Sequence, residues 1–210
     1  MEFEIKGQHL DLLAEKAIYW REEQALLLSD LHLGKAAHFR KAGVPVSSHI
    51  HIQELFVLDA LIEAYHPRAI YFLGDLFHSD INTEWQMISA WCENYPEIDK
   101  HLVLGNHDFL PKKLYENANF IVHDSLIVGP FFLSHDREEK EGFYNLSGHV
   151  HPGVSLVGSG KQSIKLPCFY FSESYALLPA FGQFTGLHRI RPTEKDFVFV
   201  IAENEVFSVS

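Results

Sequence analysis

Five short strings of side chains that can bind metal ions occur in the 210-residue sequence, each directly after an apolar run. They offer carboxylates, imidazoles and an amide oxygen, and these donors suit Mn²⁺, Fe or Zn²⁺. The strings contain no cysteine, which argues against a structural zinc site. Asp-x-His or Gly-Asp alone is ordinary turn chemistry, whereas Gly-Asn-His-Asp and Gly-His-x-His are rarer, and the five strings together predict a metal centre. The strings are Asp30-Leu31-His32, Gly74-Asp75, Gly105-Asn106-His107-Asp108, His135 and Gly148-His149-Val150-His151.

The spacing within two strings favours joint presentation of ligands. Residues i and i+2 of an extended chain point to the same side, so we expect Asp30 to act with His32, and His149 with His151. A glycine directly precedes three of the candidate ligands. Glycine there permits a tight turn and a close approach of the backbone to a ligand.

Alternating strands and helices must position these strings. Apolar runs predict strands over 25–28, 69–73 and 101–104, and helical periodicity predicts helices over 47–65 and 83–95 between them. The first 20 residues and the chain after residue 120 predict short, mostly antiparallel strands. We expect an α/β fold with a single domain over residues 1–210 and no separate cap domain. The ligand strings would then meet at the carboxyl ends of strands.

Composition limits the classes of function. The chain has 28 Asp and Glu against 17 Lys and Arg, a formal charge of −11. This balance argues against coating nucleic acid or an anionic membrane through bulk charge, but it leaves room for a small cationic site. Two cysteines cannot form a disulfide framework, and no secretory signal is visible. No apolar stretch approaches the roughly 20 residues that span a bilayer. The composition predicts a cytoplasmic protein without a membrane partner.

In this order, the five strings resemble the motif set of the calcineurin-like metallophosphoesterases. The resemblance spans about residues 29–151 and implies a four-layer α/β/β/α sandwich with mixed sheets and a two-metal centre between them. It implies one metal ion held by Asp30, His32 and His151. It implies a second ion held by Asn106, His135 and His149, with Asp75 bridging both. His123 is the alternative to His135, because serine precedes His135 where many relatives have glycine.

The same resemblance implies the chemistry of the centre. His107 would be the catalytic group that faces the phosphoryl oxygens, and Asp108 would orient its ring. Two divalent ions, with Mn²⁺ expected and Fe or Zn²⁺ as alternatives, would activate water and polarise the phosphoryl group. This implies a hydrolase of phosphoester bonds. A non-catalytic scaffold is the opposing class, and it is disfavoured because every implied ligand and His107 are present.

Two segments are similar to a narrower group, the bacterial DNA-ligase-associated metallophosphoesterases (PdeM type). They are DLHLGKAAHFRKAGVPVS at 30–47 and LPAFGQFTG at 178–186. The similarity implies a phosphodiesterase or endonuclease that acts on DNA in bacterial repair, with a DNA ligase and associated repair proteins as partners. The alternative is hydrolysis of nucleotides or other small phosphoesters.

Several further residues are candidates for substrate contacts. Phe39 and Phe181 are candidates to stack on bases, although core packing is the commoner role of such side chains. His78 follows Asp75 closely and is a candidate to approach the centre. Four side chains just after the first string are expected at the rim of the metal cleft, where they would bind phosphates beside the scissile bond; the alternative is a solvated helical face. They are Lys35, His38, Arg40 and Lys41.

Overall fold

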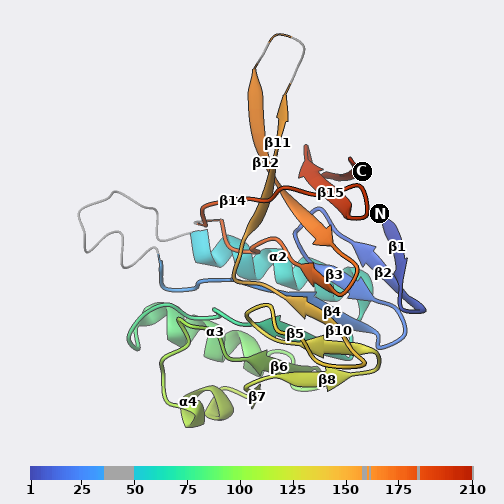
Figure 1. Cartoon of the computed structure of the whole chain (residues 1–210). Helices are drawn as coiled ribbons and strands as arrows, with labels where there is room; N and C mark the ends of the chain where they lie inside the picture. The colour runs from blue at the N-terminus through green and yellow to red at the C-terminus, as the bar shows by residue number, and fades with distance from the viewer. Residues whose placement is uncertain (36–49, 158–159, 161, 184, 210) are drawn as a thin grey trace.

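Two mixed β-sheets pack face to face in the computed structural model, and helices cover the outer face of the first sheet (Figure 1). The structure describes residues 1–35, 50–157, 160, 162–183 and 185–209. The α/β class and the two-sheet sandwich confirm the expected fold. No helix within the described ranges is long and apolar enough to cross a membrane.

The first sheet contains seven strands in chain order, of which β1 to β4 are antiparallel and β4 to β7 are parallel. Both parallel strands β4 and β5 are buried along their whole length, which is why they read as unbroken apolar runs. The strands are β1 (Glu2–Ile5), β2 (Gln8–Leu12), β3 (Ile18–Trp20), β4 (Ala25–Leu28), β5 (Ala69–Leu73), β6 (Asp99–Val103) and β7 (Phe120–His123).

The parallel strands are connected through helices. The described helices are α2 (Ile50–Tyr65), α3 (Thr83–Glu93) and α4 (Lys112–Asn117). Helix α3 begins where the sequence predicted, because the Asn82 side chain accepts a hydrogen bond from the Trp85 N–H and caps its first turn. The expected start of α2 at residue 47 lies outside the described residues.

The second sheet is mixed, as the family resemblance implied, and five of its eight described strand pairs are antiparallel, as expected from the sequence. Strands β9 and β10, β10 and β13, and β11 and β14 pair in parallel. Its path is β14 (His188–Arg189), β11 (Pro152–Val157), β12 (Ser163–Phe171), β13 (Tyr175–Leu177), β10 (Tyr144–Ser147), β9 (Phe131–Leu133) and β8 (Leu126–Val128). Strand β15 (Phe197–Ala202) pairs with β12, and β16 (Glu205–Ser208) pairs with β15.

Two apolar layers hold the sandwich together. The layer between the sheets includes Trp20, Leu73, Phe131 and Phe169, all fully buried. The layer between the first sheet and the helices includes Phe72, Leu58, Trp91 and Tyr115. Burying aromatic and aliphatic side chains of this size stabilises a fold by about 1.5–3 kcal/mol each. The facing sheets are therefore held firmly below the loops that carry the ligand strings.

The outer face of the second sheet differs from the four-layer arrangement. The helices of the described residues all pack on the first sheet. On the second sheet a smaller apolar cluster includes Val154, Cys168 and Val198, and Ile190 packs against it. In the described part of the chain, an irregular segment around Ile190 therefore stands where an outer helical layer was expected.

Candidate metal centre

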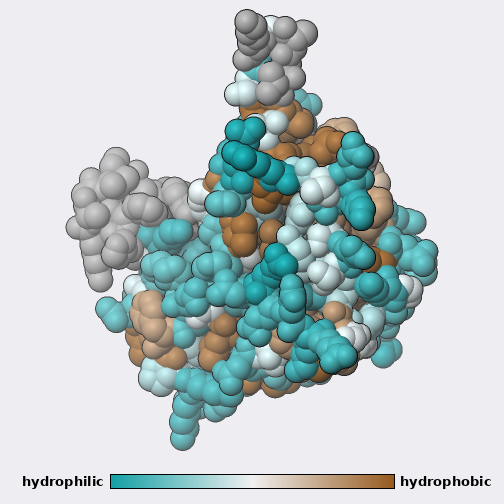
Figure 2. All heavy atoms as spheres, viewed as in Figure 1, coloured by the Kyte–Doolittle hydropathy of each residue, from teal (hydrophilic) through white to brown (hydrophobic). Residues whose placement is uncertain are grey.

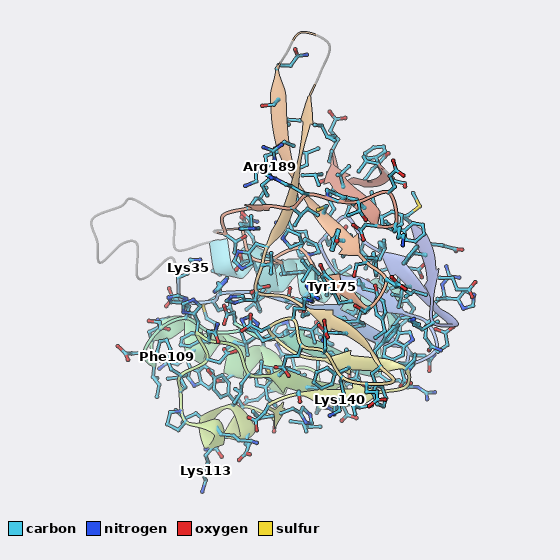
Figure 3. The ribbon with its side chains drawn as sticks, viewed as in Figure 1. Lys35, Phe109, Lys113, Lys140, Tyr175 and Arg189 are labelled. Atoms are coloured by element: carbon cyan, nitrogen blue, oxygen red, sulfur yellow. The ribbon has the colours of Figure 1, made fainter. Side chains whose placement is uncertain are left out.

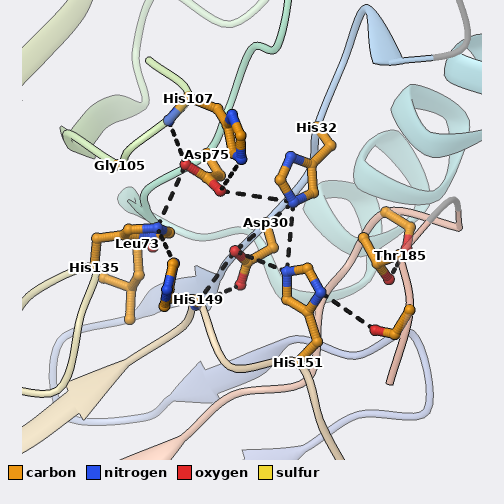
Figure 4. Close-up of polar contacts among 12 residues, drawn as sticks. Asp30, His32, Leu73, Asp75, Gly105, His107, His135, His149, His151 and Thr185 are labelled. Atoms are coloured by element: carbon orange, nitrogen blue, oxygen red, sulfur yellow. Dashed lines mark hydrogen bonds and ion pairs between the residues drawn. The ribbon is translucent and has the colours of Figure 1, made fainter. Parts of the chain in front are cut away.

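The loops after β4, β5, β9 and β10 converge at one edge of the sandwich (Figure 4). Backbone hydrogen bonds join them. The Asp30 N–H donates to the Gly74 carbonyl at 3.0 Å, and the His32 N–H donates to the Asp75 carbonyl at 2.8 Å. These bonds fix the first two ligand strings relative to each other.

One group of converging side chains comprises Asp30, His32 and His151, whose donor atoms all lie within 4.8 Å of one another. His151 Nε2 lies 3.2 Å from Asp30 Oδ1 and 3.4 Å from His32 Nε2. Asp30 and His32 are both buried. The structure thus brings together residues as far apart in the chain as His32 and His151, which are separated by 119 positions, as the sequence predicted.

A second group comprises Asp75, His135 and His149, again within 4.8 Å of one another. His135 Nε2 lies 3.4 Å from Asp75 Oδ1 and 3.1 Å from His149 Nδ1. The other carboxylate oxygen of Asp75, Oδ2, lies 3.7 Å from His32 Nε2. The Asp75 carboxylate therefore lies between the two groups, with one oxygen toward each.

The donor atoms of both groups fit divalent cations. His135 Nδ1 donates to the Leu73 carbonyl at 2.9 Å, which directs the Nε2 lone pair into the second group. His151 Nδ1 likewise faces the Gly186 carbonyl at 3.3 Å, so its Nε2 is directed into the first group. Metal-binding histidines are commonly fixed in this way through the second ring nitrogen. Converging imidazole lone pairs beside buried carboxylates form a donor set for a cation.

The protonation states suit the same purpose. Burial, followed by the nearby Lys35 cation, lowers the pKa of His32 to about 3, so its imidazole is neutral at neutral pH. Burial pushes the pKa of Asp30 upward, but the His151 and His135 imidazoles outweigh burial and lower it. Cations bind neutral imidazoles and ionised carboxylates.

Left-handed backbone conformations aim the ligand side chains. The values of φ are between +50° and +60° for five of the seven expected ligands. Non-glycine residues adopt this region rarely, at a cost of about 1–3 kcal/mol each, and such residues gather at functional sites. The paired ligands thus converge through left-handed turns and not through the extended chain that the i, i+2 spacing suggested. These five residues are Asp30, His32, Asp75, His149 and His151.

Two glycines are required by the packing of the ligands. Gly74 has a φ of +84°, and a Cβ at this position would overlap the His135 ring. A Cβ at Gly148 would lie 2.6 Å from Asp30 Oδ2. A glycine before a ligand therefore serves here for close approach of backbone to side chain.

His107 lies at the edge of the centre. Its backbone N–H donates to Asp75 Oδ1 at 2.9 Å, and its ring Nε2 lies 3.9 Å from Asp75 Oδ2. The half-exposed ring stacks on His78 with the ring centroids 3.8 Å apart. His78 thus approaches the centre, as one interpretation of the sequence allowed. Asn106 lies on the same turn with an exposed side chain.

The Asp108 side chain has a different environment from the expected one. Its carboxylate accepts hydrogen bonds from the Phe77 N–H at 3.0 Å and the Gly105 N–H at 2.9 Å. Burial raises the pKa of Asp108 to about 6. Asp108 therefore ties the loop after β5 to the loop after β6, and within the described residues these backbone bonds replace the expected bond to the His107 ring.

The alternative ligand His123 lies elsewhere. Its Nε2 is 3.0 Å from His101 Nδ1, and the two rings stack on β6 and the neighbouring edge strand β7. His135, in contrast, is buried within the second group. The structure brings His135, and not His123, to the other candidate ligands.

The expected substrate contacts are only partly described. Lys35 lies beside the centre: burial lowers its pKa, while the charges of Asp75 and Asp30 oppose that shift. Phe181 is buried against the helical layer, so it packs in the core and does not offer a face to a base. The other candidates, which lie outside the described residues, are His38, Phe39, Arg40 and Lys41.

Residues of the loop at 178–186 contact Asp30 and His151 of the first group. The sequence did not predict which residues of the loop make these contacts. The Gly182 N–H donates to the Asp30 carbonyl at 3.0 Å, and the Gly186 carbonyl faces His151. On α2, the buried Glu54 accepts a hydrogen bond from the Gln183 N–H at 2.9 Å. The sequence did contain one signal for this contact: a carboxylate at position 54 lies on the apolar face of the helix that also carries Leu58, where a buried charge needs a partner.

The chain is similar to a known family and to solved structures. Residues 24–170 match the family described as calcineurin-like phosphoesterase. The crystal structure of Pseudomonas putida nuclease MPE is 29% identical with a TM-score of 0.83, covering 100% of this chain and 99% of that chain. Yfce, a phosphoesterase from E. coli, is 10% identical with a TM-score of 0.45, covering 88% of this chain and 97% of that chain. No curated protein matches the sequence.

Proposed function

The chain belongs to the calcineurin-like phosphoesterase family, a family of hydrolases that act on phosphoester bonds, and we propose that it is a two-metal phosphodiesterase that cuts DNA internally. The position of the Asp75 carboxylate between two groups of ligands carries the proposal of two metal ions. The full-length similarity to a nuclease supports nucleic acid as the substrate.

The proposed ligand sets follow the two groups. Asp30, His32 and His151 hold one ion, and Asn106, His135 and His149 hold the other, with Asp75 shared. Mixed carboxylate and imidazole donors favour Mn²⁺, with Fe and Zn²⁺ as alternatives. When bound, two such ions polarise the phosphoryl group and make a water molecule nucleophilic near neutral pH.

His107 is the proposed catalytic side chain. Its backbone N–H is anchored on the Asp75 carboxylate, and its ring is supported by the His78 ring. The half-exposed ring lies at the edge of the metal centre, where its Nε2 can donate a hydrogen bond to a phosphoryl oxygen or a proton to the leaving oxygen. Lys35 lies next to the centre and supplies a positive charge for a phosphate beside the scissile bond.

The cellular context is proposed from the sequence resemblance. The segments at 30–47 and 178–186 are similar to DNA-ligase-associated metallophosphoesterases, which supports a role in bacterial DNA repair beside a DNA ligase and associated repair proteins. We also propose that residues 1–210 act as one cytoplasmic domain without a cap.

The test compares four substrates with Mn²⁺. The purified protein is incubated with bis-(4-nitrophenyl) phosphate, its monoester analogue, a circular single-stranded DNA and a circular double-stranded DNA. We expect turnover of the diester above the monoester and cutting of a circular DNA, which has no ends for an exonuclease. Asp75→Asn is the matched inactive control and should bind fewer than two ions per chain.

Three outcomes would contradict parts of the proposal. Absence of turnover with Mn²⁺, Fe²⁺ and Zn²⁺ would overturn catalysis and favour a scaffold. Cleavage of the small diester without cleavage of either DNA would favour a nucleotide or another small substrate. Two bound ions in Asp75→Asn would overturn the bridging role of this carboxylate.

A further inference from the structure

Strands β11 and β12 form a hairpin that extends beyond the body of the sandwich (Figure 1). The hairpin is attached directly to the metal centre, because β11 begins at the residue after His151. Strand β14 pairs with the root of β11, and the His188 N–H donates to the His151 carbonyl at 2.9 Å. The root of the hairpin therefore forms part of the border of the candidate active site.

The register of these strands assigns their side chains to two faces. Arg189 lies opposite Gly153, and Lys165 lies opposite Ser155. Opposite residues share a face and alternate residues return to it, so all four lie on one face. The alternating neighbours Val154 and Leu166 pack in the outer apolar cluster.

Lys165 and Arg189 thus lie on the inner face of the root. Following β12 along this face leads to Phe169 and Phe171, which are buried between the two sheets. Outside the sandwich, therefore, the apolar inner face gives way to cationic side chains.

The charge of this region contrasts with the rest of the chain. Residues 150–192 contain four Lys or Arg and one acidic residue, a net charge of +3, so the remainder carries −14. Lys165 and Arg189 are both exposed. Among the described residues no carboxylate pairs with Arg189, and the Lys165 ammonium group donates to the Leu187 carbonyl. Figure 3 shows Arg189 at the root of the hairpin, on the same side of the molecule as Lys35.

We propose that Lys165 and Arg189 bind the phosphate backbone of a nucleic-acid strand that continues beyond the scissile phosphate. Gly153 lies two residues, roughly 7 Å, beyond His151 along β11, and Ser155 lies four residues, roughly 13 Å, beyond it. Their partners Arg189 and Lys165 therefore reach flanking phosphates and not the reacting one. This inference rests on the proposed nucleic-acid substrate.

The outer face of the hairpin suggests an alternative partner, a second copy of the chain. Leu156 and Ile164 are directly opposite each other and both exposed, and apolar side chains gather at the hairpin root in Figure 2. A second copy of the chain could bury these groups. Two exposed cations that no carboxylate of the described residues neutralises, next to a phosphoesterase centre, favour a polyanion instead.

The test uses the double variant Lys165→Ala/Arg189→Ala with Mn²⁺ present. The kcat/KM for a labelled oligonucleotide and for bis-(4-nitrophenyl) phosphate are measured from low to moderate salt. At low salt, we expect the double variant to lower kcat/KM for the oligonucleotide on the order of tenfold more than kcat/KM for the small diester. The slope of log kcat/KM against log salt should become shallower by about 1.4, since each phosphate contact on a single strand contributes about 0.7.

Lys112→Ala/Lys113→Ala is the matched control. It removes the same charge from exposed positions on α4, at the opposite end of the molecule (Figure 3). The control should keep the wild-type ratio between the two substrates and the wild-type salt slope. The charge-preserving variant Lys165→Arg/Arg189→Lys should keep most of the oligonucleotide activity, which separates charge from folding.

The outcomes separate this inference from the proposed function. A wild-type protein that cleaves neither substrate would overturn the function itself. Equal losses on both substrates, or an equal loss in the α4 control, would overturn the inference while leaving the function standing. A wild-type salt slope in the double variant, together with a dimer that Ile164→Glu dissociates, would assign the hairpin to a second copy of the chain.

Discussion

Glu54 provides a direct test of how the chain positions its first group of ligands. Its carboxylate accepts a hydrogen bond from the Gln183 N–H at 2.9 Å in a buried position on α2. One residue earlier in the same loop, the Gly182 N–H donates to the Asp30 carbonyl at 3.0 Å. Three residues later, the Gly186 carbonyl faces His151 Nδ1. Replacing Glu54 should therefore disturb two candidate ligands that it does not touch.

The size of the effect follows from the bond that is lost. A hydrogen bond to a charged group is worth about 1.5–3 kcal/mol, and a neutral one about 0.5–1.5 kcal/mol. Glu54→Ala should lower the free energy of unfolding by about 1.5–3 kcal/mol, and Glu54→Gln, which keeps an acceptor, by less. Loss of a group that orients a metal ligand typically weakens metal binding by about 10–100-fold.

The assay combines urea denaturation of the metal-free protein with calorimetric titration of Mn²⁺. Asp59→Ala is the matched control. Asp59 lies on the same helix, and its carboxylate accepts hydrogen bonds from the Trp91 indole N–H and the Tyr95 hydroxyl, both at 2.7 Å. It should lose stability without losing metal affinity. Glu54→Ala could lose the expected ~1.5–3 kcal/mol of unfolding free energy and still bind Mn²⁺ as tightly as the wild type. In that case the loop at 178–186 does not orient the ligands, and the reasoning is refuted.

Four further perturbations test individual parts of the structure. Gly74→Ala should lower the free energy of unfolding by about 1–3 kcal/mol through strain at φ +84°, and it should also lose bound metal. The control Gly7→Ala has open space around its Cβ and should keep its metal content. Equal metal loss in both variants would contradict the crowding of position 74 by His135. His107→Ala should keep its metal by elemental analysis and lose about 10²–10⁴-fold in turnover; loss of metal would make it a structural residue. Burial lowers the pKa of both His101 and His123, so below pH 6.5 the unfolded chain binds more protons than the folded one, and the protein should become less stable as the pH is lowered. In urea titrations at pH 7 and 5.5, His123→Gln should show a smaller difference in stability than the wild type. An unchanged difference would exclude this histidine pair as its source. Burial raises the pKa of both cysteine thiols to about 12, so neither should react with Ellman's reagent until the protein unfolds, and fast labelling of the native protein would contradict their burial.

The parallel part of the fold was predictable because local sequence and burial agree there. Strands β4 and β5 are buried on both faces and therefore appear as pure apolar runs, and the polar string after each run marks its end. The order of the strings then placed Asp30 and Asp75 at one sheet edge without any knowledge of side-chain positions. Turn residues and strand ends are local signals, and they determined this half of the structure.

The mixed pairing of the second sheet was not predictable from local sequence. Strands β9, β10 and β13 have three or four residues each and pair in parallel with partners that are distant in the chain. Strands this short carry little periodicity, so packing against the first sheet decides their partners. The same holds for Glu54 and Gln183, which lie 129 positions apart.

The geometry of the ligands explains why residue type was easier to predict than orientation. Five candidate ligands adopt left-handed backbone conformations. Asp and His adopt this region more often than most residues, but it is still uncommon for them, so residue type alone does not predict five such residues together. The Asp108 carboxylate showed the same limit, because two backbone N–H groups compete successfully for the oxygens expected near His107. Residue type can be taken directly from the sequence, whereas the direction of each side chain depends on loops that come together only when the chain folds.

Strain of this kind persists only where the surrounding structure holds it in place. Here the strained loops hold one another: Asp30 is hydrogen-bonded to Gly74 on one side and to Gly182 on the other, and Gly148 is hydrogen-bonded to His135 at the ends of the neighbouring strands β10 and β9. Each of these bonds links loops from different strands, so no single ligand can relax to an ordinary conformation without breaking contacts of its neighbours. The protein thus maintains the arrangement of its donor atoms through its own backbone. A centre built in this way should bind cations with little further rearrangement, because the folding of the two sheets has already offset the conformational cost.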